Sequence, residues 1–383
     1  MERADLRQWV QALPGAVDSG GWVFLQDPGW SAPERAKAAE VRETAGAAAS
    51  PRGWLCIPTG GTSGRIRFAR HDEQTLGAAV AGFQRHFGVS QVNSVGVLPL
   101  HHVSGLMAHV RAAATGGHHY QADWRRVAGG DLPEVKAASF LSLVPTQLQR
   151  LLEDSVAVDW LRRFVAVFVG GAPTWSSLAE RAATARVPLI LSYGMTETAA
   201  MVAAQHPGDF LAGRRDAGTA LPHARISLTD RGESDGGRIV IEGESVFRGY
   251  VGEPDLRGPL VTEDWGGLTD TGRLRVFGRR DAVIITGGEK VWPAEVEAVL
   301  RATGFLRQVV VLGVPDPQWG EAVVACHPSP ALTPGQMEAV RQAMEGALVR
   351  YKHPKRFLAV EPWPENDQGK VNRTALLAAA VRS

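Results

Sequence analysis

Short apolar runs alternate with amphipathic stretches through the first two hundred residues of the chain. The predicted buried strands are 54–58, 94–98, 138–144 and 164–169. Between and before them, apolar residues recur at helical spacing, which predicts helices at 35–42, 72–87 and 145–153. This alternation of strands and helices is typical of a layered α/β architecture with parallel strands.

The pattern changes after about Val202. Glycine-punctuated strands are predicted at 224–228, 237–242, 245–250 and 273–278, which indicates a β-rich subdomain. Beyond Asp281 the chain predicts an α+β unit, with helices at 293–302 and 333–348 and strands at 308–314 and 322–327. We therefore expect a large N-terminal domain at 1–280, built of layered α/β subdomains and a β-rich subdomain, and a small mobile α+β domain at 281–383.

Composition narrows the class of protein. Hydrophobic residues make up 44% of the 383 positions and charged residues 21%, which excludes wholesale disorder. The net charge of +1 creates no field that would gather nucleic acid or anionic lipid. Cys56 and Cys326 stand alone, so neither a disulfide framework nor a structural zinc site is expected. With no long apolar run and no signal-peptide core, we expect a cytoplasmic enzyme without a membrane span; a homodimer is left open.

The first segment with chemical potential follows the strand at 54–58. It comprises Thr59, Gly60, Gly61, Thr62, Ser63 and Gly64. Free backbone N–H groups in such a loop can wrap a polyphosphate, with Arg67 as a further donor. No Lys-Ser/Thr pair follows the last glycine, so this is not a GxxxxGK[ST] loop. An ordinary strand-to-helix turn explains the segment equally well.

Three further segments carry polar residues suited to a nucleotide. The run Tyr193, Gly194, Met195, Thr196 and Glu197 ends an apolar strand, where α/β folds bind ligands. Glu197 could hold Mg²⁺ and Thr196 could donate to phosphates, although a capping threonine and a solvated glutamate are the simpler interpretation.

Asp264 could accept two vicinal ribose hydroxyls with help from Arg279, unless Arg279 merely pairs with Asp281. Lys370, beside a glycine, could neutralise charge on a transferring phosphoryl group, whereas most lysines near a C-terminus are simply solvated.

Taken in order, these segments resemble the motifs of the adenylate-forming acyl-CoA synthetase superfamily. Residues 193–197 are similar to its Tyr-Gly-Met-Thr-Glu motif, 278–281 to Gly-Arg-x-Asp, and 369–370 to the Gly-Lys of the catalytic lysine motif. The phosphate loop departs from the family pattern, with Gly60, Ile66 and Arg67 in place of Ser, Pro and Lys. The resemblance implies that ATP and a carboxylic acid form an acyl-adenylate and pyrophosphate, after which coenzyme A displaces AMP.

The same resemblance implies a role for each matching residue. It implies that residues 59–67 bind the β- and γ-phosphates and that Thr196 and Glu197 bind the α-phosphate and Mg²⁺. Asp264 and Arg279 would bind the ribose. The remaining implied roles belong to the nucleotide-side residues Gly171, Ala172, Pro173, Tyr193, Gly194 and Met195, the catalytic Lys370, the hinge Asp281, and Gly287 and Gly288 of the pantetheine tunnel. In this scheme the C-terminal domain swings about Asp281 to assemble two active sites in turn.

The stretch after 98 bears on the choice of acid. Pro-Leu-His-His-Val-Ser-Gly at 99–105 resembles a motif of the o-succinylbenzoate–CoA ligases of menaquinone and phylloquinone biosynthesis, with His101 in place of Phe. The short N-terminal segment of 58 residues before Thr59 also favours that group.

In a helix from Ser104, both Ala108 and Arg111 fall on the same face. Arg111 precedes three alanines, a setting in which a guanidinium needs an anion, and a dicarboxylate supplies one. Alternatively Arg111 reaches solvent or pairs with an internal carboxylate. His102 would touch the acid, unless it is a satisfied core histidine. Three other functions stay open: a ligase for another aromatic or medium-chain acid, an adenylation domain that loads the phosphopantetheine of a carrier protein, and a nucleotide-binding protein without turnover.

Overall fold

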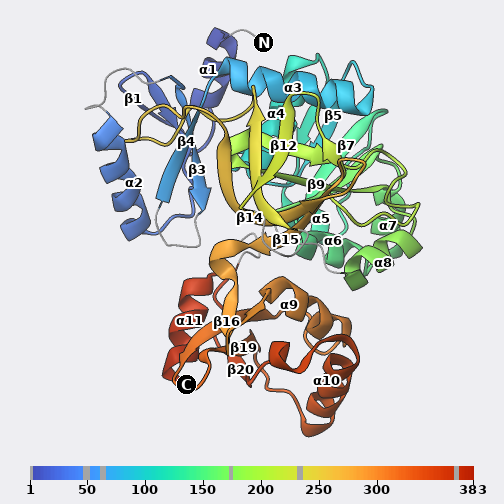
Figure 1. Ribbon diagram of the computed structural model, residues 1–383. Coiled ribbons are helices and arrows are strands. Elements are labelled where there is room, and N and C mark those ends of the chain that lie inside the picture. Colours follow the sequence, from blue (N-terminus) through green and yellow to red (C-terminus); the bar gives the residue numbers. More distant parts are fainter. Residues whose placement is uncertain (1–2, 46–51, 61–65, 172–175, 231–235, 366–370) are drawn as a thin grey trace.

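The structure, a computed structural model, describes residues 3–45, 52–60, 66–171, 176–230, 236–365 and 371–383. Figure 1 shows two bodies joined near β15 and β16, a large one that holds three sheets and a small one that holds a fourth. This mixed α/β architecture with a small C-terminal domain confirms the predicted fold class.

A seven-stranded sheet forms the centre of the large domain, in the order β11-β10-β9-β8-β7-β5-β6. Its strands are β5 (Asn93–Gly96), β6 (His119–Gln121), β7 (Ser139–Leu143), β8 (Ala166–Val169), β9 (Leu189–Met195), β10 (Ala200–Ala204) and β11 (Thr219–Ala220). The accompanying helices are α3 (Glu73–Phe87), α4 (Val103–Ala114), α5 (Trp124–Ala128), α6 (Pro145–Leu151), α7 (Ser155–Leu161) and α8 (Ser176–Thr184). Strands β5 to β9 pair in parallel, as the alternating pattern predicts, whereas β10 and β11 run antiparallel.

Helix α3 shows how local sequence sets an element's ends. The Asp72 side chain accepts a hydrogen bond from the backbone N–H of Thr75, whose hydroxyl in turn accepts from the Asp72 backbone N–H. This capping box satisfies donors that the first turn leaves free. Gly88 ends the helix in the left-handed region, at φ +64°.

A four-stranded sheet at the N-terminus provides the strands on either side of the phosphate-loop segment. Its elements are α1 (Arg3–Gln11), β1 (Val17–Ser19), β2 (Trp22–Phe24), α2 (Ala32–Ala45), β3 (Leu55–Gly60) and β4 (Ile66–His71). Strands β3 and β4 are antiparallel, with Gly60 opposite Ile66. The segment therefore connects the strands of a hairpin, and its interpretation as a strand-to-helix turn is wrong because β4 intervenes before α3.

The third sheet is antiparallel and matches the predicted β-rich subdomain. It comprises β12 (Ala224–Thr229), β13 (Gly237–Gly243), β14 (Leu260–Leu268) and β15 (Leu274–Arg279). The strand predicted at 245–250 is wrong, because this segment is a turn and a loop. Its backbone bonds reach other elements: Phe247 N donates to Glu197 O at 2.8 Å and Arg248 N donates to Arg70 O at 2.8 Å.

The small domain contains β16 (Ile284–Thr286), β17 (Glu289–Val291), α9 (Pro293–Ala302), β18 (Val310–Asp316), β19 (Gly320–Pro328), α10 (Pro334–Ala347), β20 (Arg356–Val360) and α11 (Arg373–Arg382). Helices α9 and α10 pack on the sheet through a common apolar core. Short 3₁₀ turns occur at η1 (Thr196–Thr198), η2 (Arg280–Ala282) and η3 (Arg350–Lys352).

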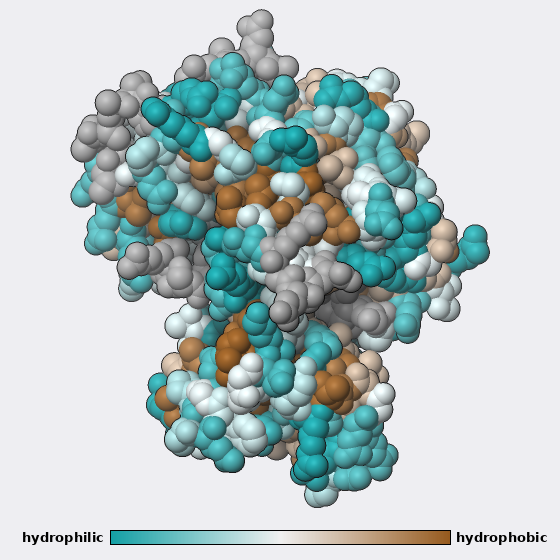
Figure 2. All heavy atoms as spheres, viewed as in Figure 1, coloured by the Kyte–Doolittle hydropathy of each residue, from teal (hydrophilic) through white to brown (hydrophobic). Residues whose placement is uncertain are grey.

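Hydrophilic side chains cover most of the surface visible in Figure 2, and apolar ones gather over the strands β12–β14 in the middle of the large domain. Within the described ranges, none of the helices combines the length and the apolar character that a membrane crossing requires.

Candidate functional site

Tyr193 and Asp264 join the parallel sheet to the antiparallel one. Tyr193 lies near the carboxyl end of β9, and its hydroxyl donates to Oδ2 of Asp264 on β14 at 2.6 Å. Burial raises the pKa of the Tyr193 phenol well above its usual range, so the hydroxyl remains a donor. Burial also raises the pKa of the Asp264 carboxyl. A half-buried carboxylate beside the carboxyl end of a parallel strand is suited to accept hydrogen bonds from hydroxyl groups of a ligand.

Arg279 connects this pair to the start of the small domain. Its Nε and Nη2 atoms donate to the two carboxylate oxygens of Asp281 at 2.8 and 2.6 Å, and its Nη1 lies 3.9 Å from Oδ1 of Asp264. The Asp281 carboxylate raises the pKa of Arg279. The expected alternative, an Arg279–Asp281 ion pair, is thus present, and its two side chains are 45% and 46% exposed. An ion pair this exposed contributes little stability and can exchange partners.

A second cluster gathers Glu197, Tyr250 and Arg67 from three separate segments. The Tyr250 hydroxyl donates to Oε1 of Glu197 at 2.6 Å and accepts from Nη2 of Arg67 at 3.0 Å. The Arg67 guanidinium also lies 3.8 Å from the centre of the Tyr250 ring, a cation–π contact. Burial raises the pKa of Tyr250 well above its usual range, so the phenol stays protonated between the two charged groups.

Gly194 allows this cluster to form where β9 turns back into β10. A Cβ atom at Gly194 would lie 2.0 Å from the carbonyl oxygen of Ala200, so only glycine permits this close approach of the backbones. Met195 ends β9 and donates its backbone N–H to the Thr198 hydroxyl at 3.0 Å. Thr196 and Glu197 follow in η1, half-buried.

His71 fixes the backbone of Thr196. Its Nε2 lies 2.8 Å from Thr196 O and its Nδ1 lies 3.0 Å from the Thr75 hydroxyl. Because a carbonyl only accepts, Nε2 carries the proton and Nδ1 is the acceptor. The ring is fully buried, and this burial lowers the pKa of His71 to about 4. A neutral histidine therefore donates a hydrogen bond to the Thr196 carbonyl and fixes the position of its backbone.

Sequence reasoning missed both His71 and Tyr250. Neither has a local signal, since each acts through a contact with a distant segment. Tyr250 lies in the stretch that the pattern wrongly assigns to a strand, and its backbone carbonyl accepts from Nε of Arg70 at 3.1 Å.

Arg111 lies on α4 and is buried, with 4% of its surface exposed. Its guanidinium stands 4.5 Å from the ring centre of Phe83, and among the residues that the structure describes its Nε has no hydrogen-bond partner. Burial lowers the pKa of Arg111 to about 10, so it stays charged at neutral pH. Within the described part of the chain it pairs with no carboxylate, and it is almost fully shielded from solvent, so neither sequence-based alternative is observed among these residues. A cavity of about 10 Å³, lined in part by Ser94, Ala108 and Ser142, lies beside it.

His102 and Ser104 lie at the beginning of the same helix. His102 is the residue before the first turn and is half-buried, with its ring centre 4.4 Å from that of His101. Ser104 is half-buried, and Ala108 faces the cavity with Arg111, as the helical spacing predicts. No hydrogen bond links Arg111 or Ser104 to the Tyr193 or Glu197 clusters within the described ranges.

The remaining predicted positions divide between the two domains. Thr59 is buried in β3 and Gly60 ends that strand, while Gly171 follows β8 at φ +80°. Gly287 and Gly288 form the turn between β16 and β17 at φ +58° and +84°, a region that favours glycine. The predicted positions Gly61, Thr62, Ser63, Gly64, Ala172, Pro173 and Lys370 lie outside the described residues.

Comparison with known proteins agrees with these observations. The family model described as AMP-binding enzyme matches residues 6–251, and that of the AMP-binding enzyme C-terminal domain matches 295–370. The chain is 31% identical over 329 residues to a 2-succinylbenzoate–CoA ligase of Listeria monocytogenes serotype 4b (strain F2365), covering 83% of this chain and 68% of that one. A 2-succinylbenzoate–CoA ligase of Geobacillus sp. (strain WCH70) is 27% identical, with 83% and 67% covered.

Solved structures give the same result. The o-succinylbenzoate CoA synthetase of Bacillus subtilis, in complex with its acyl-adenylate intermediate, superimposes with a TM-score of 0.74 at 25% identity, covering 85% of this chain and 69% of that one. The same enzyme in complex with ATP and magnesium ion gives a TM-score of 0.72 at 25% identity, with 85% and 70% covered. From its motifs, its fold and these matches, the chain belongs to the AMP-binding enzyme family.

Proposed function

We propose that this chain ligates o-succinylbenzoate to coenzyme A, with ATP as the energy source. Ligases and synthetases for this acid are among its similar proteins. The observation that carries the choice of acid is Arg111, a buried cation with no carboxylate partner in the described ranges. A buried guanidinium is costly without an anion. The acid has two carboxylates, so one can react while the other balances Arg111.

The reaction has two steps. In the first, an oxygen of the reacting carboxylate attacks the α-phosphorus of ATP, and the bond to the β-phosphate oxygen breaks to release pyrophosphate. In the second, the thiolate of coenzyme A attacks the carbonyl carbon of the acyl-adenylate, and AMP leaves. The products are o-succinylbenzoyl-CoA, AMP and pyrophosphate.

We assign the groups that bind ATP to residues of the large domain that the family motifs select. Asp264 accepts the ribose hydroxyls, assisted by Arg279 once that guanidinium leaves Asp281. Arg67, with the backbone of Thr59–Gly64, neutralises the β- and γ-phosphates. The backbone at Gly171–Pro173 and Tyr193–Met195 borders the nucleotide, and Thr196 donates to the α-phosphate.

The Glu197 carboxylate fits a magnesium ion. It is half-buried, and its Oε1 is held by Tyr250, so an oxygen ligand of the kind Mg²⁺ prefers is held in place. When bound, Mg²⁺ neutralises phosphate charge in the transition state. Lys370, in the small domain, stabilises the charge that develops between the acyl carboxylate and the α-phosphate.

The proposal includes a domain boundary between 280 and 281, with Asp281 as the hinge. Two observations support it: β15 ends at Arg279, and the small sheet begins at Ile284. Rotation there withdraws Lys370 and brings the Gly287–Gly288 turn to the pantetheine tunnel, so one active site serves adenylation and a second serves thioester formation. His102 and Ser104 contact the acid. Because ATP and coenzyme A are cytoplasmic substrates, we place the enzyme in the cytoplasm.

The test is release of pyrophosphate and AMP with ATP, Mg²⁺ and coenzyme A over a panel of acids: o-succinylbenzoate, benzoate, a medium-chain fatty acid and acetate. We expect turnover with o-succinylbenzoate and a large loss on Arg111→Ala, with partial retention in Arg111→Lys. Arg225→Ala, which removes an arginine whose side chain is 75% exposed, is the matched control and keeps full activity. Preference for a monocarboxylate would overturn the choice of acid, and ATP binding without turnover would overturn ligase activity.

A further inference from the structure

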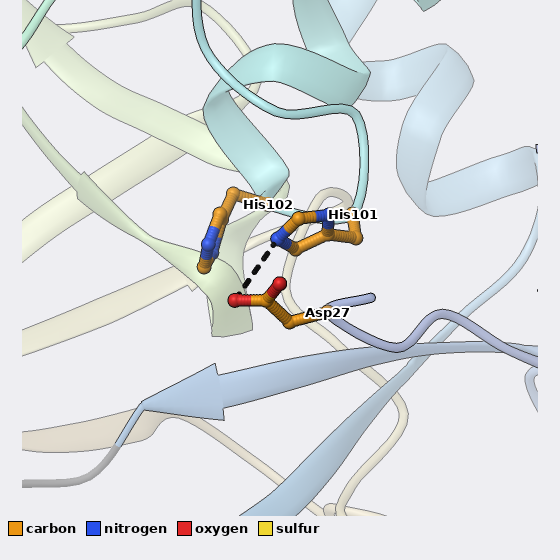
Figure 3. Close-up of side chains that lie close together, drawn as sticks. All are labelled: Asp27, His101 and His102. Atoms are coloured by element: carbon orange, nitrogen blue, oxygen red, sulfur yellow. Dashed lines mark ion pairs between the residues drawn. The ribbon is translucent and has the colours of Figure 1, made fainter. Parts of the chain in front are cut away.

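Three potential metal ligands meet beside the start of α4 (Figure 3). Asp27 follows β2, and His101 and His102 immediately precede the helix. One ligand atom from each of the three residues lies within 4.8 Å of the others. Oδ2 of Asp27 is 3.5 Å from Nε2 of His101. We propose that Asp27, His101 and His102 bind a divalent transition-metal ion, with Zn²⁺ as the representative case.

The donor set selects the class of ion. Two imidazoles and one carboxylate suit Zn²⁺ and its neighbours, and they leave a fourth position for water. Bonds of about 2.0–2.1 Å from zinc place tetrahedral donors roughly 3.3 Å apart, so rotations of these side chains from their present separation complete the site. Mg²⁺ prefers six oxygen ligands and is a poor competitor here. The site is thus chemically distinct from the Glu197 carboxylate.

The backbone holds both halves of the cluster in place. Gly29 N donates to Oδ1 of Asp27 at 2.8 Å, which leaves Oδ2 directed at His101. His102 N donates to Pro99 O at 3.1 Å, and its own carbonyl accepts from Leu106 N at 2.9 Å as α4 begins. Binding therefore orders few additional groups, which lowers its entropic cost.

Burial is also suited to an ion. The His101 side chain is 10% exposed and that of Asp27 is 32% exposed. Water is largely excluded from the imidazole, which strengthens its interaction with a cation, while the carboxylate side stays open for entry. His102 is also the residue that we assign to the acid, so the ion and the acid site would share this side chain. The test does not depend on which acid the enzyme uses, because binding is measured without any substrate.

The test uses the full chain stripped with a chelator, in buffer with millimolar Mg²⁺. Equilibrium dialysis measures bound Zn²⁺, and Co²⁺ provides the visible absorption of a low-coordinate nitrogen site. We expect one ion per chain, displacement of Co²⁺ by Zn²⁺, and affinity weakened at least about tenfold in His101→Phe and Asp27→Asn. His118→Phe, the same change at an exposed histidine, keeps wild-type affinity.

His101→Phe is a favourable variant because phenylalanine is the residue of the related motif at this position, so the fold tolerates it. Thermal melting of the metal-free protein and adenylation activity check that both variants remain folded. Failure of the wild type to bind Zn²⁺ above the level of the two variants would overturn the proposal. Equal affinity for Zn²⁺ in the wild type and in His101→Phe would show that the ion binds elsewhere, and this result would also overturn the proposal. Neither result would affect the assigned ligase function.

Discussion

Replacing Tyr250 with phenylalanine removes one oxygen atom from the centre of the cluster formed by Glu197, Tyr250 and Arg67. That oxygen donates to Glu197 at 2.6 Å and accepts from Arg67 at 3.0 Å. The ring stays, and with it the stacking of the Arg67 guanidinium at 3.8 Å. Tyr250→Phe therefore isolates the hydrogen bonds from the packing, and we expect it to slow adenylation by loosening the Glu197 carboxylate.

The magnitude follows from the type of bond that is lost. A hydrogen bond to a charged group contributes about 1.5–3 kcal/mol. At about 1.4 kcal/mol per factor of ten, full loss of this positioning slows adenylation roughly 10- to 100-fold. Because Glu197 is the proposed magnesium ligand, the loss is greatest at low Mg²⁺ and shrinks as Mg²⁺ saturates.

The assay is single-turnover pyrophosphate release across a series of Mg²⁺ concentrations. Tyr120→Phe makes the same chemical change at a tyrosine that is 58% exposed, and it keeps the wild-type rate. A Tyr250→Phe rate within about twofold of wild type at every Mg²⁺ concentration would refute the positioning role. A loss that is the same at all Mg²⁺ concentrations would separate Tyr250 from the metal.

Three further predictions concern other residues. Lys370→Ala loses most adenylation but keeps ATP affinity, as isothermal calorimetry can show; an unchanged rate would refute its role. His71 has a folded pKa of about 4 against an ordinary value of 6.5, so the unfolded chain binds the extra proton and stability falls as pH drops from 6.5 toward 4. By about pH 5 the free energy of unfolding has fallen by about 2 kcal/mol. Urea unfolding of the His71→Gln variant should not show this pH-dependent fall. Asp255→Ala removes the carboxylate that pairs with the Arg70 guanidinium, and the Arg70 side chain is 0% exposed. We expect the free energy of unfolding in urea to fall by about 3 kcal/mol, and a fall of less than about 0.5 kcal/mol would contradict this.

Elements with local signals could be predicted from sequence. The helix predicted at 293–302 is observed at Pro293–Ala302, because a proline at its first turn and regular apolar spacing define it. The helix predicted at 72–87 differs only by its cap, Asp72. The strand predicted at 245–250 is wrong because the backbone partners of this segment, Glu197 and Arg70, are distant in sequence. Local alternation contains no information about such partners.

The residues of the candidate site also divide into those with a local sequence signal and those without one. The family resemblance selects Tyr193 and Asp264, and the structure brings them into a hydrogen bond 71 positions apart in the chain. The resemblance could not select Tyr250 or His71, because each acts by a hydrogen bond to a motif residue that is distant in sequence. It also left Arg279 between two partners, and the structure gives Asp281 the closer contact.

Two buried arginines show how charge can separate structural from functional residues. Arg70 has five N–H donors, and the structure gives five bonds: to the carbonyls of Arg52, Arg248, Tyr250 and Glu253 and to the carboxylate of Asp255. All its donors have partners within the protein, so Arg70 stabilises the fold by linking β4 to the backbone at 248–253.

Arg111 has equally little exposure but a different environment. Its guanidinium contacts the face of Phe83, and its Nε has no hydrogen-bond partner within the described ranges. Burial lowers the pKa of Arg111 to about 10, and no carboxylate pairs with it in the described part of the chain. A fold selected only for stability replaces such a residue, since an apolar side chain of similar volume costs nothing in desolvation. An anion that comes from outside the protein would balance an arginine in this position, and we propose the second carboxylate of the acid as that anion.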